Sequence, residues 1–142
     1  MQLFGDVLFY ADREVAEWVA SRITDMKAPF QNYVALGVVR NGHFAGGIVY
    51  HDNVGHDIMA SAAFATLRWW KPETVKTLFA YPFITNGNAR ITIKTGKDNI
   101  RSRRMIERLG FKLEGVHPLA IDGKADAVTY GMVRDDCDWL KD

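Results

Sequence analysis

The segment that precedes Pro72 carries the residue types that bind an anion. Arg68 and Lys71 supply two positive charges, and a proline at this place is typical of the first turn of a helix. Unpaired backbone N–H groups and the helix dipole at such a start favour a phosphate or a carboxylate. The alternative is that Trp69 and Trp70 are packing residues and that the two cations lie at a solvated edge. The segment lacks the glycines of a P-loop or a dinucleotide fingerprint, so those classes lose support.

A second polar segment follows Lys97. Asp98 or Asn99 can cap a helix whose apolar stripe includes Met105, and Gly110 is a residue that ends helices. The segment contains Ser102 in its first turn and four arginines, at positions 101, 103, 104 and 108, which are more typical of a solvated helix face.

The elements that must position these residues follow from apolar periodicity, which changes type along the chain and predicts one α/β layer structure. Asn41-Gly42 and Asp122-Gly123 are hairpin signals. The strand that ends before Arg68 is rich in alanine where a central strand would carry Val or Ile, so something else must fill the space beside it. A right-handed crossover from this strand to the next predicts a mixed sheet with one parallel step. The predicted strands span 3–10, 33–40, 43–50, 57–66, 89–95 and the two flanks of Asp122-Gly123. The predicted helices span 11–23, 72–81 and about 99–109, and Pro82 is expected to end the second of them.

Length and charge exclude several classes of protein. The chain has 142 residues, 48% of them hydrophobic, which predicts a single domain over residues 1–142. Eighteen Lys and Arg residues against seventeen Asp and Glu leave a formal charge of +1, so a nucleic-acid partner is not expected. One cysteine, Cys137, allows no internal disulfide, and no Cys/His cluster has the spacing of a metal site. Without a basic and apolar leader or a long apolar run, a cytoplasmic protein with no membrane segment is expected.

The segment 97–115 carries a family resemblance. Asn99-x-x-Ser102, Leu109-Gly110-Phe111 and Glu114-Gly115 resemble the GCN5-related N-acetyltransferases, particularly those akin to the ribosomal-protein N-terminal acetyltransferases. The resemblance implies an α/β (α+β) fold with a mixed, mostly antiparallel central sheet, one splayed parallel strand pair and flanking helices. A looser pattern looks like short bacterial and phage acetyltransferases and comprises Trp69, Pro72, residues 78–83, Arg90, residues 130–132 and Trp139.

The same resemblance implies that acetyl-CoA lies between the splayed strands. Ala63, Phe64 and Ala65 would offer backbone groups to pantetheine, and the loop before Pro72 would hold the pyrophosphate. That loop departs from the family's usual Arg/Gln-x-x-Gly-x-Gly/Ala pattern. The implied cofactor-binding residues are Ala63, Phe64, Ala65, Arg68, Trp70, Lys71, Asn99, Ser102 and Arg104.

The catalytic roles implied by the resemblance centre on Ser102, whose hydroxyl would lie near the thioester sulfur. Many relatives have a tyrosine four residues later as general acid for the leaving thiolate; here that position is Ile106, so Ser102 is the remaining candidate, directly or through water. Asn99 and Ser102 also have a purely structural interpretation, as helix cap and first-turn polar residue. For the general base, His51 beside Asp52 is the first choice, unless the amine arrives neutral or gives its proton to water. The other candidates for the base are His56, Asp57 and His117.

Two hypotheses from different classes follow. The first is an N-acetyltransferase that transfers an acetyl group from acetyl-CoA to a protein N-terminus, a lysine or a small-molecule amine by direct attack. The alternative is a non-catalytic acyl-CoA-binding or protein-interaction module on the same fold. Trp139 and Leu140, expected to be exposed near the C-terminus, could contribute to a homodimer.

Overall fold

The computed structural model describes residues 1–23, 30–66 and 71–141. Arg68 and Trp70, two of the predicted cofactor-binding residues, lie outside the described residues. The strands are β1 (Gln2–Phe4), β2 (Val7–Phe9), β3 (Val34–Arg40), β4 (His43–His51), β5 (Asp57–Phe64), β6 (Arg90–Gly96), β7 (Lys112–Ile121) and β8 (Ala125–Val133), and the α-helices are α1 (Asp12–Ala20), α2 (Pro72–Ala80) and α3 (Ile100–Leu109).

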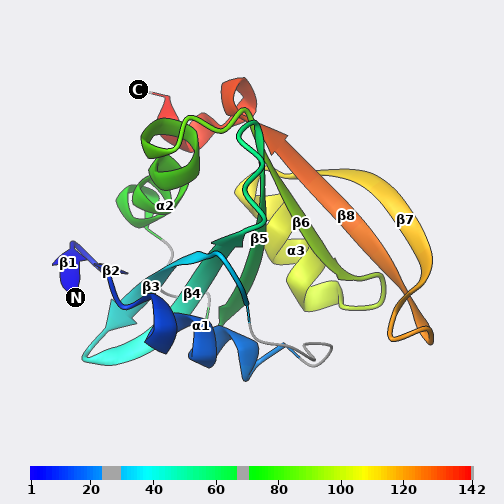
Figure 1. Cartoon of the computed structure of the whole chain (residues 1–142), viewed down its shortest axis with the longest axis horizontal. Coiled ribbons are helices and arrows are strands. Elements are labelled where there is room, and N and C mark those ends of the chain that lie inside the picture. The colour runs from blue at the N-terminus through cyan, green and yellow to red at the C-terminus, as the bar shows by residue number, and fades with distance from the viewer. Residues whose placement is uncertain (24–29, 67–70, 142) are drawn as a thin grey trace.

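The strands form one eight-stranded sheet in the order β1-β2-β3-β4-β5-β6-β8-β7. Neighbouring strands run antiparallel except β5 and β6, which are parallel and joined by the crossover through α2. Figure 1 shows α1 beside β3 and β4, and the β7–β8 hairpin at the other end of the sheet. The mixed, mostly antiparallel sheet with one parallel pair and flanking helices, which the sequence predicted, is confirmed.

The parallel pair separates part of the way along its length. β5 and β6 pair from Asp57 with Arg90 to Ala60 with Ile93. Beyond these residues β5 continues to pair with β4 as far as Phe64, and β6 continues to pair with β8 through residue 96. The sheet therefore divides into two halves beyond Ala60, and β5 and β6 lose their mutual backbone hydrogen bonds there.

The two faces of the sheet are covered by different helices. On one face, α1 packs through Val15 and Val19 against Ala35 and Val49 of β3 and β4. On the opposite face, α2 and α3 cover a larger apolar cluster that includes Leu78, Phe79, Met105, Ile106, Ile58 and Ile91. Because successive strand residues point to opposite faces, alternate residues of β5 face α1 and α3.

Several local predictions are confirmed by the backbone. Asn41 and Gly42 have φ of 54° and 78°, the left-handed pair that a two-residue hairpin turn requires. Asn99 caps α3, its side-chain oxygen accepting a hydrogen bond from the Ser102 N–H at 3.2 Å. Gly110 ends the same helix with φ of 105°. The start of α3, which bears the predicted site residues, is thus fixed by local chemistry.

Three expectations are wrong. The predicted first strand is a hairpin, β1 and β2, because Gly5 turns the chain with φ of 58°. Pro82 does not end the helical region, which continues as a π-helical turn over Tyr81–Thr85. Trp139 and Leu140 are partly buried against the main core, and the Trp139 indole N–H donates to the Leu109 carbonyl at 2.7 Å. They are therefore packing residues rather than an exposed interface.

None of the helices in the described ranges has the length and the apolar composition needed to cross a membrane. Within the same ranges, no group of three or more His, Cys, Asp or Glu residues is arranged to hold a metal ion.

Candidate functional site

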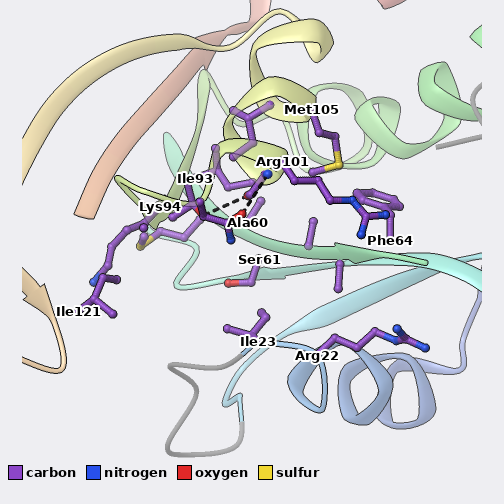
Figure 2. A pocket seen from close by; sticks show the side chains of 18 of the residues that line it. Arg22, Ile23, Ala60, Ser61, Phe64, Ile93, Lys94, Arg101, Met105 and Ile121 are labelled. Carbon is purple, nitrogen blue, oxygen red and sulfur yellow. Dashed lines mark hydrogen bonds between the residues drawn. The ribbon is translucent and has the colours of Figure 1, made fainter. Parts of the chain in front are cut away.

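A cleft of about 570 Å³ opens where β5 and β6 separate. It passes between the two halves of the sheet and has walls on both faces, from α3 on one face and, on the face covered by α1, from Arg22 and Ile23, which follow that helix. Figure 2 shows Met105 and Arg101 of α3 on one side of β5, and Arg22 and Ile23 on the other side. A molecule seated between the strands could therefore be reached from both faces of the sheet.

The α3 wall contains the predicted Asn99 and Ser102. The Thr95 hydroxyl at the end of β6 donates a hydrogen bond to Ser102 Oγ at 3.0 Å, which leaves the Ser102 hydroxyl proton free to point elsewhere. The Asn99 side-chain oxygen accepts the hydrogen bond that caps α3, which confirms the structural interpretation of Asn99 as a helix cap. Ile106, where many relatives have tyrosine, is only 1% exposed and also lines the cleft. Ser102 is thus the hydroxyl that α3 presents here.

A hydrogen-bonded chain ties α3 to the sheet. Arg103 donates from Nε to the Tyr130 hydroxyl at 2.9 Å and from Nη1 to the Lys97 carbonyl at 2.9 Å. The Tyr130 hydroxyl in turn donates to the Glu107 carboxylate. Burial and the Glu107 hydrogen bond raise the pKa of Tyr130, so this phenol stays a donor. Arg103, predicted as part of a solvated face, therefore helps to position the start of α3.

The backbone of β5 supplies the wall between the faces. The Ala65 N–H donates to the Ala45 carbonyl at 2.9 Å, so Ala65 is bonded to β4. Hydrogen bonding alternates along an antiparallel pair, and Ala63 and Ser61 are therefore also directed to β4, while the backbone groups of Ala62 and Phe64 face the opening. Of the three residues predicted to offer backbone groups, only Phe64 directs them to the opening between β5 and β6.

The α1 wall contains His51, at the end of β4. Its Nδ1 lies 2.7 Å from Asp52 Oδ2, and its Nε2 lies 3.0 Å from the Ser61 hydroxyl of β5. The imidazole packs against Phe30, with ring centroids 5.2 Å apart, and its side chain is 14% exposed. The predicted base therefore sits on the face opposite Ser102, in the same cleft.

The other predicted residues lie away from the cleft. The Lys71 ammonium is 3.2 Å from Asp6 Oδ2 of the β1–β2 turn, so it is already paired. Arg104 is exposed and does not line the cleft, whereas the neighbouring Arg101 does. The alternative bases are also elsewhere: Asp57 accepts from Thr92 at 3.1 Å, and the cleft lining excludes His56 and His117.

Sequence reasoning missed several residues of the cleft. Ser61 is a small polar residue in the alanine-rich strand, which was the available signal. Thr95 ends a predicted strand seven residues before Ser102, and Lys94 and Arg22 bring further positive charge. Ala62 was missed because the residues that face the opening depend on the strand register.

No family profile and no curated protein sequence matches this chain. Solved structures do: the fold is that of the GCN5-related N-acetyltransferases, as the sequence resemblance implied. A GCN5-related N-acetyltransferase from Brucella melitensis is 18% identical, with a TM-score of 0.67 over 95% of this chain and 78% of its own.

Two further solved structures are also similar to this chain. The ribosomal-protein-S5-alanine acetyltransferase from Vibrio fischeri is 19% identical, with a TM-score of 0.61 over 74% of this chain and 63% of its own. RimJ of Mycobacterium smegmatis, solved in complex with CoA-disulfide, is 17% identical, with a TM-score of 0.59 over 72% of this chain and 54% of its own. This chain therefore spans less than two thirds of the length of these two proteins, and at these identities the likeness establishes the fold.

Proposed function

We propose that this protein is an acetyl-CoA-dependent N-acetyltransferase in which a bound amine attacks the thioester directly. The observation that carries the proposal is the cleft between β5 and β6, which opens to both faces of the sheet. A long, flexible thioester can enter along the α3 face while an amine approaches from the α1 face. Holding both reactants in this geometry would supply much of the rate. RimJ, a neighbour of the same fold, was solved with a CoA derivative, which supports this choice of cosubstrate.

Some groups of this protein would bind acetyl-CoA, and others would take part in the reaction. The backbone groups of Ala62 and Phe64, which are directed to the opening, would bond the pantetheine amides and polarise the thioester carbonyl. Arg101, at the start of α3, and the loop before Pro72 would bind the phosphates of acetyl-CoA. Ser102, held by Thr95, would assist departure of the thiolate.

The acceptor is an amine of a protein N-terminus, a lysine or a small molecule. The neighbours include enzymes named for a ribosomal-protein alanine and for spermidine, so the fold accommodates both kinds of acceptor.

The alternative, a module that binds acyl-CoA without turnover, is favoured by one observation: Ile106 stands where many relatives have the tyrosine general acid, and it is buried. Two measurements separate the hypotheses. At about 100 times Kd, acetyl-CoA should stabilise the folded state by roughly 2.7 kcal/mol and raise Tm. An enzyme will also release CoA-SH and yield acetylated product from an amine panel, whereas a binding module will show the Tm shift alone. An unchanged Tm with millimolar acetyl-CoA rejects both.

A further inference from the structure

Three side chains on the α1 wall form a continuous hydrogen-bonded chain: Asp52, His51 and Ser61. Asp52 Oδ2 is 2.7 Å from His51 Nδ1, and His51 Nε2 is 3.0 Å from Ser61 Oγ. A carboxylate, an imidazole and a hydroxyl in this order are the groups that move a proton away from a reacting atom. Ser61 and His51 both line the cleft, so the hydroxyl end of the chain is the end that faces a ligand.

The fold places these groups by strand pairing. His51 pairs with Met59 and Val49 pairs with Ser61, so His51 and Ser61 are diagonal neighbours on one face of the β4–β5 hairpin. Ser61 alternates with Ala60 and Ala62, whose side chains belong to the α3 face. Figure 2 shows the Ser61 hydroxyl on the Ile23 side of β5. The three hydrogen-bonded side chains therefore lie on the side of the cleft proposed for the amine, opposite Ser102.

Asp52 is held in place by an unusual backbone conformation. It follows the last residue of β4 with φ of 52°, in the left-handed region that few residues other than glycine and Asn or Asp adopt. This turn brings the carboxylate back beside the His51 ring. Phe30 covers one side of that ring, so the imidazole is held from two directions.

We infer that Ser61, His51 and Asp52 act as a proton relay for the acceptor amine, with Ser61 as the residue that contacts it. The inference rests on the proposed acetyl transfer. In the neutral ring, Nδ1–H donates to Asp52, and Nε2 accepts the Ser61 O–H. The lone pairs of Ser61 Oγ are then turned to the cleft and accept the N–H of the amine.

The proton and electron changes balance along this route. The amine lone pair forms the bond to the thioester carbon while the C=O electron pair moves to oxygen. The amine proton passes to Ser61 Oγ as the Ser61 proton passes to His51 Nε2, and the imidazolium so formed is stabilised by the Asp52 carboxylate. When the carbonyl re-forms, the C–S bond breaks and the thiolate takes the Ser102 hydroxyl proton. The imidazolium gives its proton to water and water returns a proton to Ser102, so that the net products are the acetylated amine and CoA-SH.

The test uses single-turnover acetyl transfer with three amine probes: a peptide with a free N-terminal alanine, a lysine side chain in an N-terminally blocked peptide, and spermidine. With the probe that wild type acetylates, Ser61→Ala and His51→Ala should lower the rate about 10²-fold or more, the range for a positioned base. Acetyl-CoA affinity should stay within about twofold, because the thioester enters on the other face. Ser61→Thr keeps the hydroxyl and should retain most of the rate.

One variant tests the positioning residue Asp52, and a second serves as the control for substituting a histidine of β4. Asp52→Asn keeps the left-handed turn but removes the charge, and it should slow transfer about tenfold or more at unchanged acetyl-CoA affinity. His43→Ala is the matched control, since His43 is an exposed histidine at the other end of β4 and should leave the rate unchanged. Imidazole added to His51→Ala should restore part of the rate and none in Ser61→Ala.

A second measurement does not depend on turnover. The ¹⁵N shifts of the neutral His51 ring should show the proton on Nδ1 in wild type, and a ring protonated on Nε2 would overturn the relay. If wild type transfers acetyl and Ser61→Ala does so at the same rate, the relay would be overturned but the proposed acetyl transfer would not. A kinetically competent acetyl-Ser61 would replace it with a covalent route. A wild type that neither binds acetyl-CoA nor acetylates any probe would overturn the proposed function itself.

Discussion

Gly46 and Gly47 are neighbours in β4 whose side-chain positions point to opposite faces of the sheet. A substitution at Gly46 should therefore affect ligand binding, whereas a substitution at Gly47 should affect stability. A methyl group at Gly46 would overlap the Phe64 ring, lying 2.6 Å from Cε1 and closer still to Cδ1. A methyl group at Gly47 would lie 2.8 Å from Val19 Cγ2 and 3.0 Å from Val15 Cγ1. Real Cβ atoms do not approach other atoms so closely, so each substitution forces a different neighbour to move.

The two neighbours differ in their freedom to move. Val15 and Val19 are 0% exposed between α1 and the sheet, so Gly47→Ala overpacks a closed core. The expected cost is about 1–3 kcal/mol, which corresponds to a fall in Tm of roughly 2–12 °C for a chain of this size. Phe64 is only partly buried and lines the cleft, so Gly46→Ala can be accommodated by a swing of the ring into the space between β5 and β6.

Gly46→Ala should therefore lose little stability but bind acetyl-CoA at least about tenfold more weakly, a loss of about 1.4 kcal/mol. Gly47→Ala should show the reverse, with a lowered Tm and nearly normal affinity below that Tm. Calorimetric titration with acetyl-CoA and thermal unfolding of both variants make the comparison. Adding Phe64→Leu to Gly46→Ala removes the overlapping ring and should recover affinity. Wild-type affinity in Gly46→Ala would refute the reasoning, because it would mean that the ligand does not use the space beside Phe64.

The other predictions concern single groups. Ser102→Ala should lower the single-turnover rate about 10–100-fold with acetyl-CoA affinity nearly unchanged, because the proposed role of the hydroxyl bonded to Thr95 is to assist departure of the thiolate; an unchanged rate would leave Ser102 with only a helix role. Cys137 is 1% exposed, and burial first and then Asp138 raise the pKa of its thiol, so Cys137→Ala should keep turnover; a trapped acetyl-Cys137 would contradict this. Tyr50 donates to the buried Leu78 carbonyl at 2.8 Å, so Tyr50→Phe should destabilise the fold by about 1–3 kcal/mol in thermal unfolding, and an equal Tm would mean that water replaces the bond.

Local chemistry determined a large part of this protein from the sequence. The Asn41-Gly42 turn and the end of α3 at Gly110 follow from residues that tolerate positive φ. The Asn99 cap follows from a side chain that bonds its own helix three residues on. The alanine-rich strand predicted a space beside it, and this space is the cleft between β5 and β6. These features could be predicted because each depends on residues close together in the chain.

Tertiary structure decided which side chains and backbone groups line the cleft. Strand register set whether Ala62 or Ala65 offers its backbone to the opening, because a shift of one residue exchanges the two sides of a strand. Lys71 is paired with Asp6, which is far away in sequence. His51 and Ser61 meet only because β4 and β5 pair in one register. Contacts of this kind depend on how distant segments pack, and no local pattern of residue types contains that information.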